Sequence, residues 1–307
     1  MISYNGSVLK VGSSWLHSEW DPNPLNLPPF TMRFQFGDAA SMSSSYNPTT
    51  SGQTWKTGAV WTQVSTSPNV WDYTRVDTDW EEEFYQKFSS PAVDYDTFVL
   101  GGNTAGVTNM HSTFRDCDQL RALKIFDTRS VTDMNHMFSE TAKLGYSMYN
   151  SPVYNLIDGV RTALPLFDTS SVTDMSYMFS YASEVRQVPR WNTSSVTDMT
   201  QMFAHSPIYT VPLFDTSSVT SIYAMFSSCS SLSAIPLFDT SSVDDMRETF
   251  YGCTNVASGA LALYNQASSQ TTPPSGYSQC FYNCGSNTTT GAAELAQIPS
   301  SWGGTGA

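Results

Sequence analysis

One stretch of the chain, Leu166–Phe179, returns several times with few changes. Residues 167–175 read Phe-Asp-Thr-Ser-Ser-Val-Thr-Asp-Met, and each copy ends on a phenylalanine that usually follows a second methionine. The valines of the copies are Val107, Val131, Val172, Val196, Val219 and Val243. Their spacings are 24, 41, 24, 23 and 24 residues, so one interval carries an insertion of 17 residues. A regular period of this length predicts a repeat solenoid, in which short units stack and share one continuous core.

The repeated unit resembles that of the BspA-like leucine-rich-repeat family and of the related mycoplasma-type surface-protein repeats. The family's typical unit is Leu-x-x-Leu-x-Leu-x-x-Phe-Asp-Thr-Ser-x-Val-Thr-x-Met-x-x-Met-Phe-x-x-Cys, and the resemblance covers roughly residues 99–256. It implies a leucine-rich-repeat-like solenoid of short parallel strands and short helical turns. We place this solenoid at residues 96–256, after a small β-rich domain at 1–95. Residues 257–307 should form a C-terminal capping region with a loose tail.

The repeat register predicts which side chains face the core. The mid-unit valines should form one buried column. A second buried column should contain Phe114, Phe138, Phe179, Phe203, Phe226 and Phe250. Met175 and Phe179 lie four residues apart, which predicts one or two helical turns with Thr173 or Asp174 as the cap.

Aspartates recur at two positions of the unit. The first position holds Asp127, Asp168, Asp215 and Asp239, with Asn192 among them. The second holds Asp133, Asp174, Asp198 and Asp245, with Ser221 among them. Because an Asp side chain accepts backbone N–H groups, the pattern favours turn and cap roles. Stacked carboxylates could also bind Ca²⁺, although Asn192 and Ser221 interrupt both columns.

The cysteines occupy positions that suit a small side chain. Four of the five, Cys117, Cys229, Cys253 and Cys284, lie three residues after a repeat phenylalanine. In other units Thr141, Ala182 or Ser206 fills this slot, so we expect buried free thiols. A disulfide between neighbouring units is the alternative. No Cys-x-x-Cys pair occurs and the four histidines do not cluster in the sequence, so we expect no metal site.

Residues 1–95 read as a β-rich region that holds six of the eight tryptophans: Trp15, Trp20, Trp55, Trp61, Trp71 and Trp80. Met1–Leu16 predicts a hairpin with an Asn-Gly turn, and the alternation in Phe30–Phe36 predicts a strand. Ala59–Tyr73 has strand character broken at residues 67–69. Asp77–Phe88 carries aromatic residues four apart, which predicts a short acidic helix. The tryptophans should form the core of this region, with a sugar-stacking platform as the alternative.

The insertion, at about residues 142–159, is our first candidate for a binding feature, because loops are where function is grafted onto a solenoid. Its candidate binding residues are Tyr146, Met148, Tyr149 and Tyr154. A neutral surface insertion is the alternative. Further on, Ala260–Gln266 predicts a helix, and Cys280–Cys284 predicts a last degenerate unit. Residues 294–299 and Trp302 should cover the end of the stack.

The composition and the missing motifs exclude several protein classes. With a net charge of −13 and a pI near 4.5, the chain should repel nucleic acid and anionic membranes. No stretch reaches the roughly 18 apolar residues of a membrane span. The sequence contains no glycine-rich phosphate loop, no Gly-x-Ser-x-Gly elbow and no His-Glu-x-x-His motif. We therefore expect no enzyme activity, no cofactor and no nucleic-acid partner.

Repeats similar to these occur in surface-exposed adhesion proteins of bacteria and in proteins of phages that infect gut bacteria. The N-terminus lacks a basic segment followed by an apolar run, so we expect no secretory signal. A phage protein needs none, because it assembles in the cytoplasm and leaves by lysis. The sequence therefore favours a tail, fibre or head-decoration component of a virion. Residues 1–95 would contact other virion subunits, and the solenoid would bind a host surface protein or glycan. The alternatives are a cell-surface adhesin of the BspA-like type and a glycan-binding or glycan-active protein.

Overall fold

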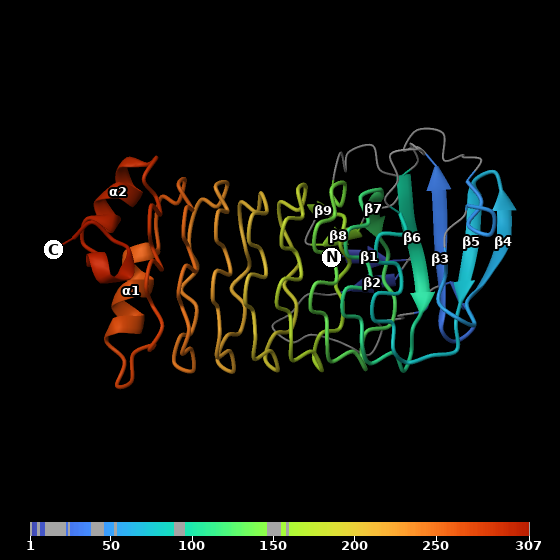
Figure 1. Cartoon of the computed structure of the whole chain (residues 1–307), viewed down its shortest axis with the longest axis horizontal. Helices are drawn as coiled ribbons and strands as arrows, with labels where there is room; N and C mark the ends of the chain where they lie inside the picture. The colour runs from blue at the N-terminus through green and yellow to red at the C-terminus, as the bar shows by residue number, and fades with distance from the viewer. Residues whose placement is uncertain are drawn as a thin grey trace.

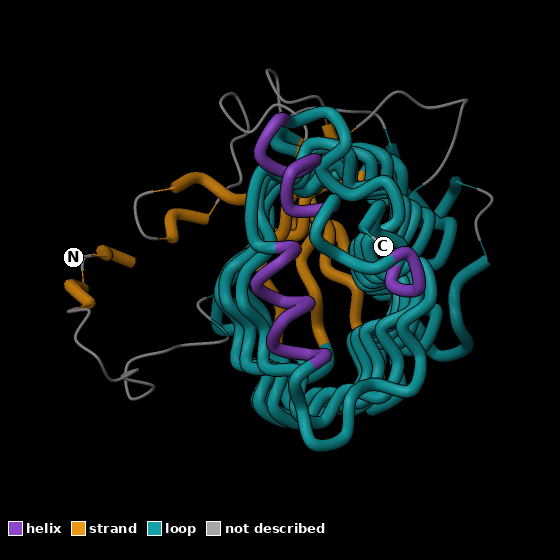
Figure 2. Tube along the Cα trace, turned by 90° about the vertical axis from the view of Figure 1, so that its left-hand side faces the viewer, coloured by secondary structure: helices purple, strands orange, loops and turns teal. Residues whose placement is uncertain are grey.

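The computed structural model describes residues 2–4, 7–9, 23, 25–37, 46–51, 54–88, 96–145, 155–157 and 160–306. The body is elongated, with a β-sheet at one end, a stack of repeat units along its length and two helices at the other end (Figure 1). Viewed along the long axis, the units lie one behind another as superposed loops (Figure 2). Within the described residues, none of the helices is long and apolar enough to cross a membrane.

A five-stranded mixed sheet, in the order β4-β5-β3-β6-β7, forms one end of the body. Its strands are β3 (Thr31–Gly37), β4 (Val60–Thr66), β5 (Asn69–Thr74), β6 (Asp96–Asn103) and β7 (Leu120–Leu123). All neighbours are antiparallel except β6 and β7, which run parallel. The strand predicted at Phe30–Phe36 and the break predicted at residues 67–69 are confirmed by β3 and by the turn between β4 and β5.

Aromatic side chains fill the space beside the sheet. The rings of Trp61 and Tyr73 lie 4.9 Å apart, and Phe34 contacts Trp61 with ring centroids 5.4 Å apart. Trp61, Trp71 and Trp80 are buried, and Trp55 is partly buried against the same core. The core role expected for the tryptophans is therefore confirmed for these positions. Trp15 and Trp20 lie outside the described residues.

Two short hairpins accompany the main sheet. β1 (Ile2–Tyr4) pairs with β2 (Ser7–Leu9), and β8 (Asn155–Ile157) pairs with β9 (Val160–Thr162), both antiparallel. The first confirms the hairpin predicted near the N-terminus, although its turn residues lie outside the described part of the chain. It lies beside the stack (Figures 1 and 2). The second lies at the C-terminal end of the predicted insertion.

The repeat units contribute eight equivalent turn segments, at residues 79–86, 109–116, 133–140, 174–181, 198–205, 221–228, 245–252 and 276–283. Parallel β-bridges join the first residues of successive segments, from Asp79 to Gly276. The phenylalanine rings of successive segments stack with centroids 5.2 to 5.7 Å apart. These rings are fully buried and the repeat valines are at most 4 % exposed, so both predicted core columns are confirmed.

The turn segments are not helical. In residues 174–181, the N–H of Tyr177 donates to the Thr200 carbonyl of the next segment at 2.8 Å. The N–H of Ser180 instead donates to the Tyr177 carbonyl at 3.0 Å. The φ angles of Tyr177 and Tyr181 are 57° and 58°, which breaks the i to i−4 hydrogen-bond pattern of a helix. The helical turn predicted over Met175–Phe179 is therefore wrong, because alternate amides bond the neighbouring unit instead.

The helix predicted over Asp77–Phe88 is also wrong. This stretch is the first turn segment, since the N–H of Phe84 donates to the Thr113 carbonyl at 2.8 Å. The stack thus begins upstream of residue 96. Here the fully buried Glu83 takes a slot that is usually Met or Thr, and its carboxylate contacts the Tyr73 hydroxyl and the Arg75 guanidinium. Burial raises the pKa of Glu83, and this contact joins the stack to the sheet.

Buried threonines link the units on another side of the stack. The Thr193 hydroxyl donates to the Asp215 carbonyl of the next unit at 2.9 Å, and Thr216 bonds the Asp239 carbonyl in the same way at 2.7 Å. The other donors of this ladder are Thr104, Thr128 and Thr169. All five threonines are at most 2 % exposed. The recurring Asp-Thr pair is thus a structural joint between units.

The five cysteines are free and buried, which confirms the expectation for Cys117, Cys229 and Cys253. The Cys229 thiol donates to the Phe203 carbonyl of the preceding unit at 2.9 Å. Ser206, in the same slot, donates to the Phe203 carbonyl at 2.7 Å. Burial raises the pKa of Cys229 to about 12. The slot therefore accepts small side chains: Cys229 and Ser206 donate a hydrogen bond there, whereas Ala182 only fills the space.

The C-terminal residues cover the last unit. Their elements are α1 (Ala260–Ser268), α2 (Thr289–Leu295) and the 3₁₀ helix η3 (Ser300–Trp302). The Glu294 carboxylate accepts the N–H of Leu261 at 3.1 Å and so caps the first turn of α1. Trp302 lies over Phe281, whose N–H donates to the Trp302 carbonyl at 2.9 Å. The helix predicted at Ala260–Gln266, the degenerate unit at Cys280–Cys284 and the covering role of Trp302 are confirmed.

Candidate functional site

The eight turn segments form one long surface, which we call the turn face. Each segment has two positive-φ positions, four residues apart, and residues of many types occupy them. At the first position these are Glu82, Ser112, His136, Tyr177, Gln201, Ala224, Glu248 and Gln279. At the second they are Gln86, Asp116, Glu140, Tyr181, His205, Ser228, Gly252 and Asn283. The backbone frame is therefore constant while the side chains it displays vary.

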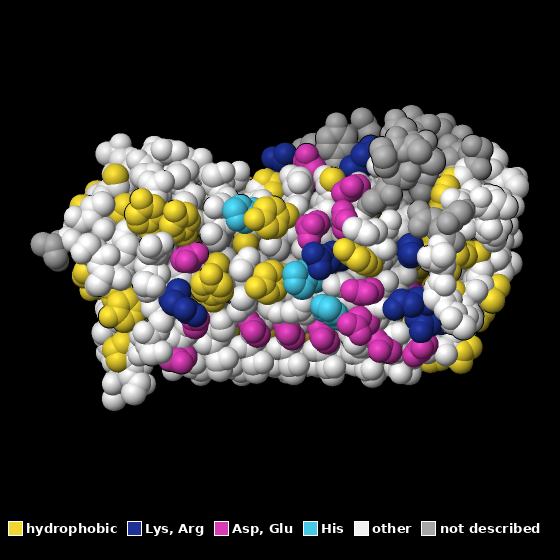
Figure 3. Space-filling model, viewed as in Figure 1, with side chains coloured by type: hydrophobic (Ala, Val, Ile, Leu, Met, Phe, Trp, Pro, Cys, Tyr) yellow, Lys and Arg dark blue, Asp and Glu magenta, His cyan; other side chains and the backbone are white. Residues whose placement is uncertain are grey.

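Histidine and tyrosine rings stack on one another across neighbouring segments of this face. The rings of His136 and Tyr177 lie 4.4 Å apart and nearly parallel, at 10°. Those of Tyr181 and His205 lie 4.3 Å apart, at 9°. The Gln201 amide reaches the Tyr177 hydroxyl at 3.3 Å. Figure 3 shows hydrophobic and histidine side chains over the middle of the stack, with acidic side chains in a row beside them.

Charged groups flank these rings. His111 contacts the Glu81 carboxylate at 3.0 Å, and Arg115 pairs with Glu140 at 2.7 Å. Burial, followed by the positive charges of Arg115 and His111, lowers the pKa of His136 to about 4. His136 is therefore neutral near pH 7, and its ring packs as an aromatic group against Tyr177.

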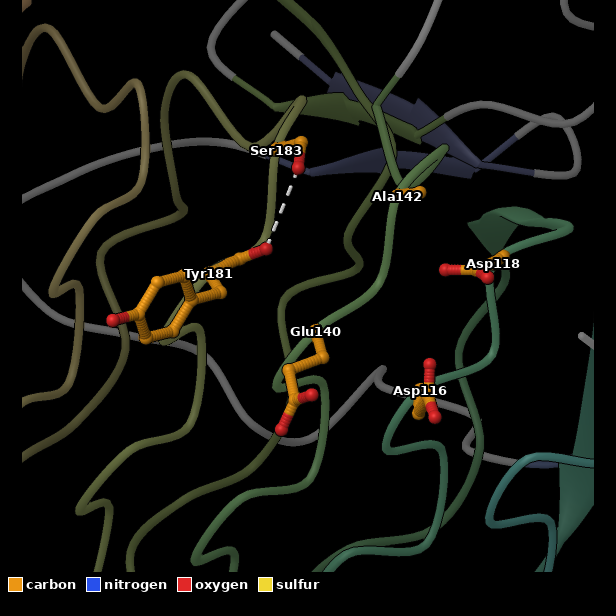
Figure 4. A pocket seen from close by; sticks show the side chains of 6 residues that line it. All are labelled: Asp116, Asp118, Glu140, Ala142, Tyr181 and Ser183. Atoms are coloured by element: carbon orange, nitrogen blue, oxygen red, sulfur yellow. Dashed lines mark hydrogen bonds between the residues drawn. The ribbon is translucent and has the colours of Figure 1, made fainter.

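A pocket opens on the turn face where the insertion leaves the stack (Figure 4). Its lining residues are Asp116, Asp118, Glu140, Ala142, Tyr181 and Ser183. The three carboxylates lie on one side and in the middle of the pocket, and the Tyr181 ring lies on the other side (Figure 4). Tyr181 is 53 % exposed. The Ser183 hydroxyl donates to the Tyr181 carbonyl at 3.5 Å.

The pocket is strongly acidic. Partial burial and the neighbouring Asp116 carboxylate raise the pKa of Asp118. Asp116 accepts a hydrogen bond from the Gln86 amide at 2.7 Å, so one acceptor site of its carboxylate is already occupied within the protein. The pocket can receive hydrogen-bond donors from a ligand, such as hydroxyl or amino groups. Among the described residues, no group of three or more His, Cys, Asp or Glu side chains is arranged to hold a metal ion.

The side chains of the two aspartate columns accept hydrogen bonds from nearby backbone N–H groups. The Asp168 carboxylate accepts the N–H of Ser170 at 3.1 Å, and that of Asp198 accepts the N–H of Thr200 at 2.7 Å. Asn192, which interrupts the first column, accepts the N–H of Ser194 at 3.2 Å. The turn role predicted for these columns is confirmed, and the neutral Asn192 performs the same task as the acid. The cap role predicted for Thr173 or Asp174 is wrong, because no helix follows; Asp174 instead accepts the N–H of Ser176 in a turn.

The four binding residues predicted from the sequence, Tyr146, Met148, Tyr149 and Tyr154, all lie outside the described residues. The structure places Ala142, at the start of that insertion, in the pocket wall. Sequence reasoning missed the stacked rings of the turn face. The signal was present, because His136 and Tyr177 occupy one slot of successive units, as do Tyr181 and His205. Those slots become informative once their outward orientation is known.

Comparison with models of protein families gives a match to the family described as "Mycoplasma protein of unknown function, DUF285". The matched regions are residues 78–210 and 145–262, which together span more than half of the 307 residues. The match begins beside Asp79, where the first turn segment starts. No curated protein and no solved structure matches the chain.

Proposed function

We propose a function from the premise that this chain belongs to the DUF285 family, a mycoplasma-type repeat family. The chain is a non-catalytic recognition and structural protein of a bacteriophage virion, as a tail, fibre or head-decoration component. Its stack is a leucine-rich-repeat-like solenoid that presents the turn face to a host surface. Residues 1–95 attach it to other virion subunits.

The observation that carries this proposal is the prearranged turn face. Side chains that are ordered before binding lose less conformational entropy when a ligand arrives. Stacking already restricts the rings of Tyr181 and His205, which lie 4.3 Å apart, and tyrosine has few rotamers to lose. A rigid frame with variable outward side chains suits recognition, and it supports binding rather than chemistry.

The ligand chemistry follows from the pocket. Its carboxylates, Asp116, Asp118 and Glu140, accept hydrogen bonds but donate none when ionised. A host glycan offers hydroxyl donors, and a host protein offers amino and guanidinium donors. Nucleic acid is disfavoured, because a chain with a net charge of −13 repels phosphate. The insertion at residues 142–159 begins with Ala142 in the pocket wall, and we propose its residues Tyr146, Met148, Tyr149 and Tyr154 as further contacts.

A bacterial cell-surface adhesin is the second candidate, because the matched family is of mycoplasma type. The two candidates differ in location, which is the virion for the first and the cell surface for the second. Mass spectrometry of purified particles and of washed cell envelopes distinguishes them. Recovery of the chain in stoichiometric amounts from particles supports the virion role, whereas recovery only from envelopes would support the adhesin.

Recognition is tested with purified chain on host cells. Glu140→Lys and Tyr181→Ala should each reduce cell binding at least tenfold, because they change the charge and one wall of the pocket. Leu213→Ala is the matched control, since Leu213 is 52 % exposed and lies outside the turn face. Replacing the four insertion residues with Ala tests the loop in the same assay. Equal binding by the Glu140, Tyr181 and Leu213 variants would remove the pocket from the proposal.

A further inference from the structure

The two ends of the body differ in how they are capped. At one end α1 and α2 cover the last unit (Figure 1), and Trp302 stacks on Phe281 of that unit. At the other end β4 is the outermost strand of the sheet, and among the described residues no strand pairs with its outer edge. Repeat arrays need covered ends, because an open edge offers unpaired N–H and C=O groups to other chains. The outer edge of β4 is therefore where a strand of another chain can add to the sheet.

The composition of β4 favours pairing. Its sequence, Val-Trp-Thr-Gln-Val-Ser-Thr, contains no charged residue and no proline, the residues that usually protect a sheet edge. Val60 is 56 % exposed and Val64 is 46 % exposed, whereas Trp61 between them is buried. A register shift between Gln63 and Ser65 leaves Val64 without a partner residue on β5, with its side chain exposed. The shift is a bulge, which bends the edge locally at Val64. The neutral sequence and the exposed side chains of Val60 and Val64 still leave this edge suited to pairing.

The net charge of the chain limits where two copies can meet. The chain carries a net charge of −13, so two copies repel each other across most of their surfaces. The β4 edge is neutral, and pairing there places the two stacks on opposite sides of the contact, where their acidic faces are far apart. An antiparallel strand paired with its own copy is also self-complementary, as a two-fold interface requires. Val and Thr side chains of the two copies would then meet across the strands, a favourable kind of cross-strand pair.

We propose that β4 pairs with β4 of a second copy of this chain, antiparallel and about a two-fold axis. The two five-stranded sheets become one continuous sheet of ten strands, and the two stacks extend in opposite directions. This interface does not depend on the proposed recognition function. It gives the protein two identical turn faces.

The test measures the mass of the full chain in solution by light scattering, across a roughly hundredfold range of concentration. The expected species is a dimer of twice the chain mass of 33.8 kDa. The double variant Val60→Lys/Val64→Lys should run as a monomer, because four lysines then meet across the dyad. Leu213→Lys/Leu237→Lys is the matched control, since both leucines are more than half exposed but lie on the stack. This control should remain a dimer, and circular dichroism should show both variants folded.

Hydrogen exchange of the wild-type chain supplies a second readout that needs no substitution. Backbone amides of β4 should become less protected on dilution, while those of the turn segments should not change. A wild-type chain that stays monomeric at every concentration would overturn the proposal. So would a dimer that the lysines in β4 leave intact. Protection of β4 only after addition of other particle or cell proteins would assign the edge to a different partner.

Discussion

Removing one ring from the phenylalanine column should damage the stack more than any surface change. Phe203 is fully buried, and its ring lies 5.7 Å from Phe179 and 5.5 Å from Phe226, both nearly parallel. A buried Phe→Ala change costs about 3–5 kcal/mol from lost transfer energy and the cavity that remains. Phe203 also stacks on Phe214, with ring centroids 6.4 Å apart. Aromatic pairs add about 0.5–1.5 kcal/mol each, so loss of three pairs places Phe203→Ala in the upper half of that range. Phe203→Leu should cost about 1.5–4.5 kcal/mol, because it removes the three ring pairs but fills most of the cavity.

Urea unfolding followed by circular dichroism gives the total loss of stability, and hydrogen exchange shows where it falls. A stack transmits damage mainly to neighbouring units. Amides of residues 174–181 and 221–228 should therefore lose more protection than those of residues 79–86. Leu213→Ala, at a 52 % exposed position, should change the free energy of unfolding by less than about 0.5 kcal/mol. A loss below about 1 kcal/mol for Phe203→Ala, or equal loss of protection in all segments, would refute the shared ring column.

Three further predictions concern buried polar groups. Thr193→Val should cost about 1–3 kcal/mol in urea unfolding, because it leaves the Asp215 carbonyl without its buried donor; Thr197→Val, at an exposed hydroxyl, should cost much less. Ellman's reagent at pH 8 should label no thiol in the folded chain, since burial raises the pKa of Cys229 to about 12 and likewise raises the others. Five thiols should react after unfolding without reductant, and fewer would indicate a disulfide. The lowered pKa of His136, about 4 against 6.5, means that its contribution to stability is complete above pH 6.5 and is lost as pH falls to about 4. His136→Gln should therefore reduce the loss of stability between pH 7.5 and 4.5, and an unchanged loss would contradict the assignment.

The core columns were predictable because each depends on one residue type at a fixed period. Phe179 and Val172 recur in unit after unit, and a side chain that repeats in this way must face the shared core. The free thiols were predictable for the same reason, since the cysteine slot also accepts Ala182 and Ser206. The turn role of the aspartates followed from Asn192, which keeps the acceptor oxygen without the charge.

The first turn segment was not predictable from the sequence, because its residues differ from those of the other copies. Trp80 and Glu83 stand where methionine is usual, and the spacing of Trp80, Phe84 and Phe88 fits an amphipathic helix equally well. The deciding contacts are long-range backbone hydrogen bonds to the next turn segment, such as that from the N–H of Phe84 to the Thr113 carbonyl. A local pattern cannot contain that information.

The pocket was hidden for a different reason. Its walls come from three turn segments and their flanks, and the carboxylates of Asp116 and Glu140 meet Tyr181 only after the units stack. The sequence identified the insertion, which begins at the pocket wall, but not the surface beneath it. The positive φ angles of Glu140 and Tyr181 were also not predictable from the sequence, because neither residue type favours that conformation.

The turn face can exist only as a collective property of the stack. Positive φ at a residue other than glycine costs about 1–2 kcal/mol, and most turn segments contain two such residues. The segment at residues 174–181 recovers this cost through four hydrogen bonds from its N–H groups to the next segment, at about 0.5–1.5 kcal/mol each. An isolated unit has no neighbour to bond and would not hold this conformation. Because neighbouring backbone, rather than residue type, fixes the geometry, the same slot can hold His136, Tyr177, Gln201 or Ala224. A frame of this kind can change the chemistry of its surface one residue at a time and keep its shape.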